Sequence, residues 1–147
     1  MQKKSVTETS AGGIVYRFID GKRHWLVIQH NHAKHWGFPK GHVGDKVDNE
    51  RLEDAALREV HEEGGIKAKI VTHDSFKNTY YYTFKNAPRK KTVHYFLMEY
   101  LSGDTKDHDF EVQEAKFVPE EDILNIITYK NDKKILEKAL AKIRLIS

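Results

Sequence analysis

The sequence predicts one α/β domain in which helices flank a mixed β-sheet. Segments with the alternation and composition of strands are interspersed with segments of helical periodicity along the chain. The length of 147 residues is close to that of a single domain, so we expect residues 1–147 to form one. The chain has 39% hydrophobic and 32% charged residues, which is typical of globular rather than disordered proteins.

The composition excludes several classes of protein and site. The absence of cysteine excludes disulfides and thiolate zinc sites. No apolar run reaches the roughly 20 residues of a membrane span, and the N-terminal segment lacks a signal-peptide core, so we expect a cytoplasmic protein with no membrane partner. The net charge of +3 permits a phosphate-rich substrate, but without a basic run we expect no stable nucleic-acid partner. The sequence leaves both a monomer and a homodimer open.

The first third of the chain predicts a β-hairpin followed by a long loop. A strand within Thr7–Phe18 is expected to begin after Gly12-Gly13. Asp20-Gly21 is a turn signal, so this strand is expected to pair with His24–Gln29. His30–Asn49 is rich in Gly, His and Lys, and this composition favours a loop.

The rest of the chain predicts a sheet with a helix before it and helices after it. The first helix covers Glu50–Glu63 and is ended by Gly64-Gly65. A second helix opens at Pro119, with acids in its first turn. The last covers Asn131–Ile146, with Ile135, Leu136, Ala139, Leu140 and Ile143 on one stripe. The expected strands are Lys67–Phe76, Thr79–Phe84, Thr92–Tyr100 and Glu111–Val118, with Asn86–Lys90 joining the second to the third.

Three glutamates near the end of the first predicted helix share one face. Glu59, Glu62 and Glu63 are spaced i, i+3 and i+4, and like charges at this spacing destabilise an isolated helix by about a few tenths of a kcal/mol per pair. At about 100° per residue they continue the apolar stripe that must face the core. The stripe contains Leu52, Ala55 and Ala56, and the solvent side is expected to carry Arg51, Asp54, Arg58 and His61.

The position of these carboxylates favours a metal site over an ordinary acidic surface. A charge run on a helix is usually a solvated face, but these groups emerge at the edge of the buried face, where an unpartnered charge is costly. A divalent cation is a suitable partner, because Mg²⁺ prefers carboxylates together with substrate phosphates. The pattern therefore predicts a dication at this end of the helix.

The segment around the glutamates resembles the box of the Nudix family, G-x5-E-x7-R-E-U-x-E-E-x-G-U, where U is aliphatic. The family commonly enters the helix through Pro-x-Gly, and Pro39-Lys40-Gly41 supplies that entry here. We therefore interpret Gly41 as the equivalent of the box glycine, with an insertion within Gly44–Asn49. Read literally, every fixed position is matched, by Gly44, Glu50, Arg58, Glu59, Val60, Glu62, Glu63, Gly65 and Ile66.

The resemblance implies a Nudix-type α/β/α sandwich with a central mixed sheet, and a hydrolase that uses Mg²⁺ or Mn²⁺. It implies that Glu59, Glu62 and Glu63 are metal ligands or the catalytic base, with the carbonyl of Lys40 as a further ligand. Glu111 matches a glutamate that often adds metal or base function, with Gln113 and Glu114 as weaker alternates. The implied structural residues are Gly41, Gly44, Gly65 and the orienting ion pair of Glu50 with Arg58.

Two further segments resemble the asymmetric diadenosine tetraphosphate (Ap4A) hydrolase branch of this family. His35–His42 reads HWGFPKGH, and Lys90–Phe96 reads KKTVHYF. Members of this branch hold the polyphosphate with a lysine of the second segment and stack adenine on tyrosines. The implied substrate-binding residues are Lys40, His42 and Lys91 for the polyphosphate, Tyr82 as the first choice for stacking, then Tyr80, and Trp36.

The substrate-binding residues also have plainer explanations. Tyr80, Tyr82 and Phe84 alternate as in any half-buried strand, and for Trp36 the plainer explanation is packing of the loop onto the core. Ala115 occupies a position where the branch often has a second tyrosine, which weakens the case for two tyrosines holding one adenine.

The sequence thus predicts a metal-dependent pyrophosphohydrolase, with cleavage of Ap4A to ATP and AMP as the leading function. The alternatives are another diphosphate substrate of the family, namely a nucleoside triphosphate, a diphosphoinositol polyphosphate or an RNA 5′ end. A non-catalytic nucleotide sensor is a third possibility, but the intact glutamates argue against it.

Overall fold

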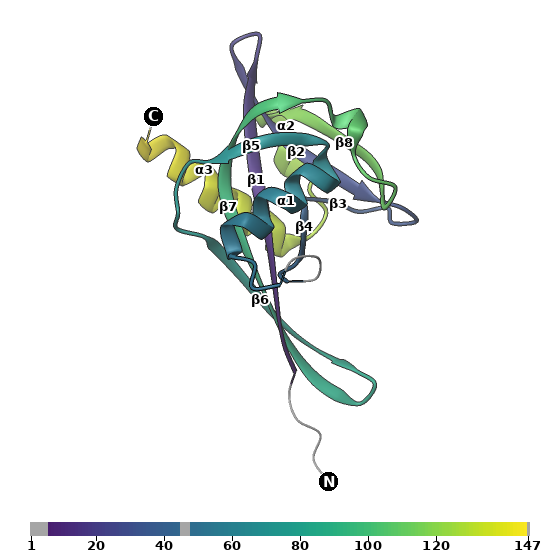
Figure 1. Cartoon of the computed structure of the whole chain (residues 1–147). Coiled ribbons are helices and arrows are strands. Elements are labelled where there is room, and N and C mark those ends of the chain that lie inside the picture. Colours follow the sequence, from purple (N-terminus) through teal and green to yellow (C-terminus); the bar gives the residue numbers. More distant parts are fainter. Residues whose placement is uncertain (1–5, 45–47, 147) are drawn as a thin grey trace.

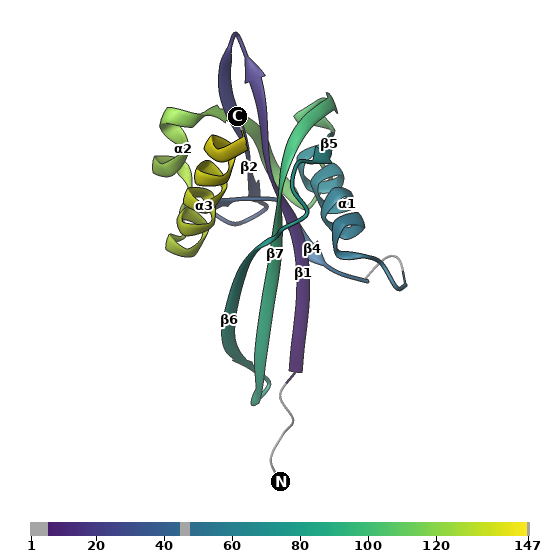
Figure 2. The same ribbon diagram turned by 90° about the vertical axis from the view of Figure 1, so that its left-hand side faces the viewer.

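In the computed structural model, which describes residues 6–44 and 48–146, a mixed sheet lies between α1 on one face and α2 with α3 on the other (Figures 1 and 2). This arrangement confirms the predicted α/β class and sandwich. No helix among the described residues is long and apolar enough to span a membrane. The elements are β1 (Val6–Ile19), β2 (Lys22–His30), β3 (Trp36–Gly37), β4 (Lys40–His42), α1 (Leu52–Gly64), β5 (Ile66–Ile70), β6 (Phe76–Phe84), β7 (Ala87–Gly103), a 3-10 turn (Thr105–Asp107), β8 (Val112–Pro119), α2 (Glu120–Ile126) and α3 (Lys130–Ile146).

The sheet is built around the parallel pair β1 and β7. Its order is β3-β2-β1-β7-β5, with β4 beside β1, β6 beside β7 and β8 beside β2. Within the described chain, only β1 and β7 run parallel, and the other pairs are antiparallel. The long strand β1 pairs with β2, β4 and β7, so it connects the two sides of the sheet.

The predicted hairpin is present, but its first strand is longer than expected. Asp20 and Gly21 have φ of 53° and 78°, the left-handed pair that a tight two-residue hairpin turn requires. The strand begins at Val6 instead of after Gly12-Gly13, because its first half pairs with β7 and β4 rather than with β2. Gly12 is needed where β4 crosses, since a Cβ there would lie 2.1 Å from the carbonyl oxygen of Pro39.

Three other predicted boundaries were wrong. The expected loop His30–Asn49 contains the short strands β3 and β4, whose pairing with β2 and β1 the local composition did not reveal. The expected strand Lys67–Phe76 divides into β5 and β6, because β5 pairs with the far end of β7 and β6 with its near end. The turn after β6 is only Lys85-Asn86, so β7 begins at Ala87, inside the predicted connection.

The sheet lies between two hydrophobic cores, and the side chains of its strands point alternately into one and the other. Along β1, Ile14 and Tyr16 face α2 and α3, whereas Ala11 and Val15 face α1. The α3 stripe predicted from the sequence is buried against the first of these cores, which confirms the amphipathic reading of that helix. Its members are Ile135, Leu136, Ala139, Leu140 and Ile143.

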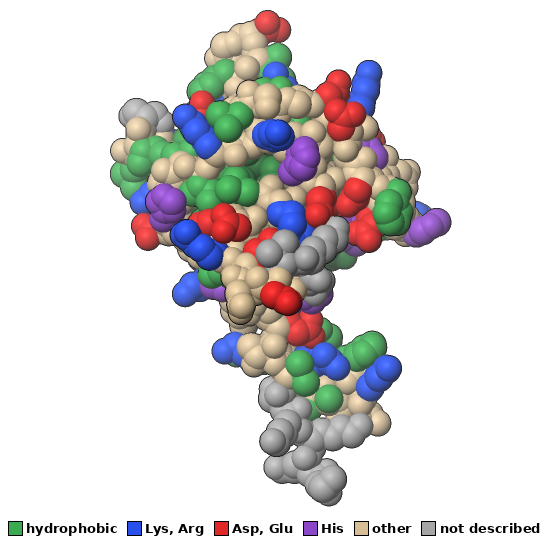
Figure 3. All heavy atoms as spheres, in the orientation of Figure 1, with side chains coloured by type: hydrophobic (Ala, Val, Ile, Leu, Met, Phe, Trp, Pro, Cys, Tyr) green, Lys and Arg blue, Asp and Glu red, His purple; other side chains and the backbone are tan. Residues whose placement is uncertain are grey.

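The hairpin of β6 and β7, together with the start of β1, projects from the body as an arm (Figure 1). Hydrophobic and basic side chains gather near its end (Figure 3). At the base of the arm, Tyr80 pairs with Lys91, so a ring and an ammonium group leave the sheet side by side. The arm therefore carries two predicted substrate-binding residues towards the loop that contains β4.

Candidate active site

Helix α1 delivers the three glutamates to one edge of the core. Val60 and the two alanines before it are buried against the sheet, and the carboxylates continue that face. Glu59 and Glu63 are only 8% and 4% exposed, whereas Glu62 is partly exposed. The helix ends where Gly65, with φ of 77°, donates its N–H to the carbonyl of His61. The glutamates thus occupy the last two turns, as the sequence predicted.

The helical periodicity predicted that Arg58 would face solvent, but in the structure it does not. Its side chain is 16% exposed, because the long stem folds back across the glutamate face. It forms a two-pronged ion pair with Glu50, with Nε–Oε2 at 2.8 Å and Nη2–Oε1 at 3.0 Å. This guanidinium lowers the pKa of Glu50. The same guanidinium reaches Glu59 at 2.8 Å and Glu62 at 3.3 Å, so Arg58 orients the carboxylates of the site.

Glycine is required at two positions of the motif, Gly41 and Gly44, for different structural reasons. A Cβ on Gly41 would lie 2.1 Å from Cδ of Glu59, so only glycine leaves room for that carboxylate. Gly44 has φ of 85° and donates its N–H to Glu50 at 3.3 Å. Of the two, Gly41 contacts a carboxylate of the site, which agrees with its interpretation as the box glycine. The insertion predicted within Gly44–Asn49 includes residues 45–47, which lie outside the described residues.

Glu63 is the most deeply placed acid of the site. Its Oε1 accepts the backbone N–H of Lys40 at 2.9 Å, and its Oε2 lies 3.5 Å from Nε2 of His30. Burial, followed by the nearby charge of Glu59, raises the pKa of Glu63 to about 8, although the Lys40 N–H opposes this rise. A buried carboxyl of this kind gains from a cation that would hold it ionised.

These groups line one polar cavity of about 430 Å³, the carboxylate pocket. It gathers the four predicted catalytic glutamates with the predicted polyphosphate-binding side chains. It also includes Ser10 and His30, which the sequence analysis missed because neither belongs to a recognised motif. Its lining residues are Ser10, His30, Lys40, Gly41, His42, Glu59, Glu62, Glu63, Lys91 and Glu111.

The donor set of the carboxylate pocket suits a hard dication. Carboxylate oxygens are the ligands that Mg²⁺ prefers, and Glu59, Glu62 and Glu63 line the same cavity. Among the described residues, no three His, Asp or Glu side chains are already grouped around a common metal position. Arg58 bonds two of the glutamates, Glu59 and Glu62, and so holds these carboxylates at the pocket. The residues therefore fit a metal ion.

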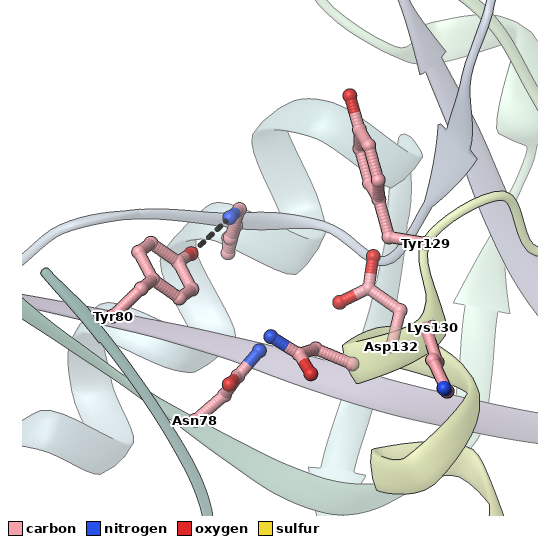
Figure 4. A pocket seen from close by; sticks show the side chains of 7 residues that line it. Asn78, Tyr80, Tyr129, Lys130 and Asp132 are labelled. Carbon is pink, nitrogen blue, oxygen red and sulfur yellow. Dashed lines mark hydrogen bonds between the residues drawn. The ribbon is translucent and has the colours of Figure 1, made fainter. Parts of the chain in front are cut away.

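A second cavity of about 440 Å³, the aromatic pocket, adjoins the first through Lys40, which lines both. Lys40 Nζ donates to the hydroxyl of Tyr80 at 2.9 Å, and the ring of Tyr129 lies on the other side of the space (Figure 4). Two rings and several amide and charged groups surround a space of nucleoside size. The lining residues are Lys40, Asn78, Tyr80, Tyr129, Lys130, Asn131 and Asp132.

Comparison with known proteins agrees with this geometry. The Nudix domain family matches residues 9–139. The chain belongs to the Nudix family. A bis(5′-nucleosyl)-tetraphosphatase (asymmetrical) of Caenorhabditis elegans is 33% identical over 131 residues, covering 88% of this chain and 91% of the relative. The crystal structure of an Ap4A hydrolase binary complex from that organism has a TM-score of 0.73 at 31% identity, covering 93% of this chain and 98% of the other.

Another relative extends well beyond the matched region. A Mycobacterium tuberculosis protein with the name "Putative mutator protein MutT4" is 33% identical over 142 residues, and this chain spans 56% of its length. Membership of the family, the carboxylate pocket and the likeness to the tetraphosphatase make this chain a Nudix pyrophosphohydrolase.

In this Nudix hydrolase, the two remaining predicted substrate-binding residues lie outside both pockets. Tyr82 donates its hydroxyl hydrogen to Glu8, and the residue is 40% exposed on the arm, so the structure favours Tyr80 over the first choice made from sequence. Trp36 packs against the larger core, with Nζ of Lys116 4.6 Å from its ring centre. The plainer explanation, loop packing, therefore accounts for Trp36.

The second tyrosine of the aromatic pocket was not predicted from the sequence. Ala115, at the position where the branch often has a tyrosine, is buried with Ile28 and Val112 and lines neither pocket. Tyr129 supplies the ring instead, from the residue just before α3. An exposed aromatic residue at the start of an amphipathic helix was the available signal, but only the packing of α3 beside β6 brings it opposite Tyr80.

Proposed function

We propose that this Nudix hydrolase cleaves dinucleoside polyphosphates asymmetrically, with Ap4A giving ATP and AMP. The observation that carries the proposal is the placement of Lys40 between the carboxylate pocket and the aromatic pocket. A ligand with a base at one end and a polyphosphate chain beside it would span both cavities. The aromatic pocket suits the base, since stacking on a protein ring contributes about 1–3 kcal/mol per base.

The similar proteins support this substrate class but leave a second one to be tested. The tetraphosphatase is similar over 91% of its own length, and its name states asymmetric action on such compounds. The mycobacterial relative, at the same 33% identity, has a different, mutator-type name, so nucleoside triphosphates, one of the alternatives from the sequence, are kept as the second class. Dinucleoside polyphosphates and nucleoside triphosphates both contain a base and a chain of phosphates, so the two classes must be distinguished by the reaction products.

A divalent ion, Mg²⁺ or Mn²⁺, would be held by Glu59, Glu62 and Glu63, with the carbonyl of Lys40 as a further oxygen ligand. When bound, such an ion neutralises phosphate charge and lowers the pKa of a coordinated water. The role of Arg58 is to keep the carboxylates on one side of the pocket. Gly41 provides the space that the Glu59 carboxylate occupies.

The other side chains position the polyphosphate and assist the attack of water. Lys40, His42 and Lys91 line the carboxylate pocket and offer donors that stabilise phosphate oxygens. Glu111 faces the same space and can accept a proton from the attacking water. Water forms the new P–O bond while the bridging P–O bond to the leaving nucleotide breaks, and the leaving oxygen departs as a phosphate anion. Most of the catalysis is positioning and electrostatics.

The test is product analysis with Ap4A in ¹⁸O-labelled water. ATP and AMP should appear in equal amounts, with the label confined to one product, because the base held in the aromatic pocket fixes which phosphorus meets the water. Glu63→Gln should abolish turnover, whereas Glu121→Gln, an exposed acid on α2, should not change it. Two molecules of ADP from each Ap4A, or faster hydrolysis of deoxynucleoside triphosphates, ADP-ribose or a diphosphoinositol polyphosphate, would contradict the proposal.

A further inference from the structure

The aromatic pocket contains a carboxyl group that the hydrolytic chemistry does not use. Asp132 lies in the first turn of α3, and its carboxyl points into the space between Tyr80 and Tyr129 (Figure 4). Within residues 6–44 and 48–146 it makes no hydrogen bond or ion pair, and Lys40 and His35 act on it only through their charges. A half-buried carboxyl without a partner is costly, so a donor on a bound ligand would stabilise it.

The groups around Asp132 match the edge of a nucleobase. The two tyrosine rings offer stacking faces, and the side-chain amides of Asn78 and Asn131 each present a donor and an acceptor. Adenine needs this combination, since its edge carries an amino donor beside ring-nitrogen acceptors. The carboxyl of Asp132 can only accept when it is ionised, so it is suited to the amino group and not to the ring nitrogens.

We propose that Asp132 accepts a hydrogen bond from the exocyclic amino group of adenine and thereby sets the base preference of the aromatic pocket. The inference rests on the proposed function only in taking this cavity as the nucleoside subsite. It assigns to Asp132 a contact with the base, whereas the glutamates and Lys40 act on the phosphates. It also explains why an acid is tolerated in a cavity lined by Tyr80 and Tyr129.

The test separates base recognition from hydrolysis by measuring binding of nucleoside monophosphates. At pH 8, calorimetry should show AMP binding about tenfold or more tightly than purine riboside 5′-monophosphate, which lacks only the amino group, as expected for a hydrogen bond to a charged group. Asp132→Ala should bring the two affinities together, because it weakens AMP alone. Asp122→Ala removes a first-turn acid from α2, outside the pocket, and should leave the ratio unchanged.

Three outcomes would overturn the assignment. These are an Asp132→Ala protein that keeps the wild-type ratio, a wild-type protein that does not distinguish the two nucleotides, and tighter binding of GMP, whose edge presents two donors to a carboxylate. A purely structural role for Asp132 would lower both affinities equally and keep the ratio, which also counts against the proposal. Failure of Ap4A cleavage with the binding ratio intact would refute the proposed function and leave the base contact standing.

Discussion

At the scale of single residues, the site depends on one glycine and one arginine as much as on its acids. Arg58 contacts Glu50, Glu59 and Glu62, and so fixes the starting position of carboxylates that would otherwise repel one another. Gly41 decides whether Glu59 can occupy its place at all. Both residues act through the position of a carboxylate rather than by contact with the reacting atoms.

Gly41→Ala should therefore lower kcat about 100-fold, the scale of loss produced by a displacement of roughly 1 Å in a catalytic group. The added methyl carbon would fall 2.1 Å from Cδ of Glu59, so the carboxylate must move. Steady-state kinetics with Ap4A, beside a thermal melt, would measure the effect. Gly21→Ala is the control: its Cβ meets nothing within 4 Å, but φ of 78° strains it, so it should lower stability slightly and leave kcat unchanged. Equal kcat values for Gly41→Ala and the wild type would show that the contact is irrelevant.

At the scale of elements, α1 carries three of the four glutamates that line the carboxylate pocket. Its apolar stripe is fixed against the sheet through Val60 and the alanines, and this packing holds Glu59 and Glu63 at the boundary of the core. The repulsion between these acids is offset by Arg58 in the free protein. A dication should offset it more strongly, because its charge is larger and its oxygen coordination more complete.

Turnover should accordingly require a divalent metal ion. EDTA should abolish hydrolysis, and Mg²⁺ or Mn²⁺ should restore it. A metal at 100 times its dissociation constant should also stabilise the fold by about 2.7 kcal/mol. Glu59→Gln should reduce this metal-induced rise in Tm. Glu53→Gln, a first-turn acid of α1 paired with Arg51, should retain it. Full activity after exhaustive chelation, or no metal-dependent shift of Tm, would show that the glutamates do not form a metal site.

At the scale of the whole molecule, the aromatic pocket is assembled from parts that are distant in the sequence. Lys40 comes from β4, Tyr80 from β6, and Tyr129 from the residue before α3. The arm brings β6 beside α3, while the pairing of β4 with β1 brings Lys40 to the same place. The aromatic pocket therefore exists only in the complete fold, whereas the three glutamates of the other pocket are local to one helix.

Removal of either ring of the aromatic pocket should weaken substrate binding. Tyr80→Ala and Tyr129→Ala should each raise KM for Ap4A about 5- to 150-fold, as expected from the loss of 1–3 kcal/mol of base stacking. The effect on kcat should be much smaller. Tyr82→Ala is the matched control, because this residue lies on the same strand but outside the pocket, and its KM should equal that of the wild type. A rise in KM for Tyr82→Ala alone would restore the interpretation made from sequence.

Local pattern was enough to predict the helix of glutamates, the hairpin turn and the buried stripe of α3. Each of these depends on residues that are a few positions apart, so periodicity and turn chemistry describe them well. The start of β1, the strands β3 and β4, and the division of the segment before β6 were not predictable in this way. Their extents follow from hydrogen bonds to strands far along the chain.

The sequence by itself determined the Nudix family, the mixed α/β fold and the three helix carboxylates that face one cavity, because the family motif lies within a single helix and its entry loop. Only the tertiary structure decided that Arg58 turns inward and that Tyr80 rather than Tyr82 borders the aromatic pocket. It also placed Tyr129 and Asp132 in the lining of that pocket. The physical reason is that a strand's alternation tells which residues share a face, but not what that face meets. For Tyr80 the answer came from α3, about 50 residues later in the chain.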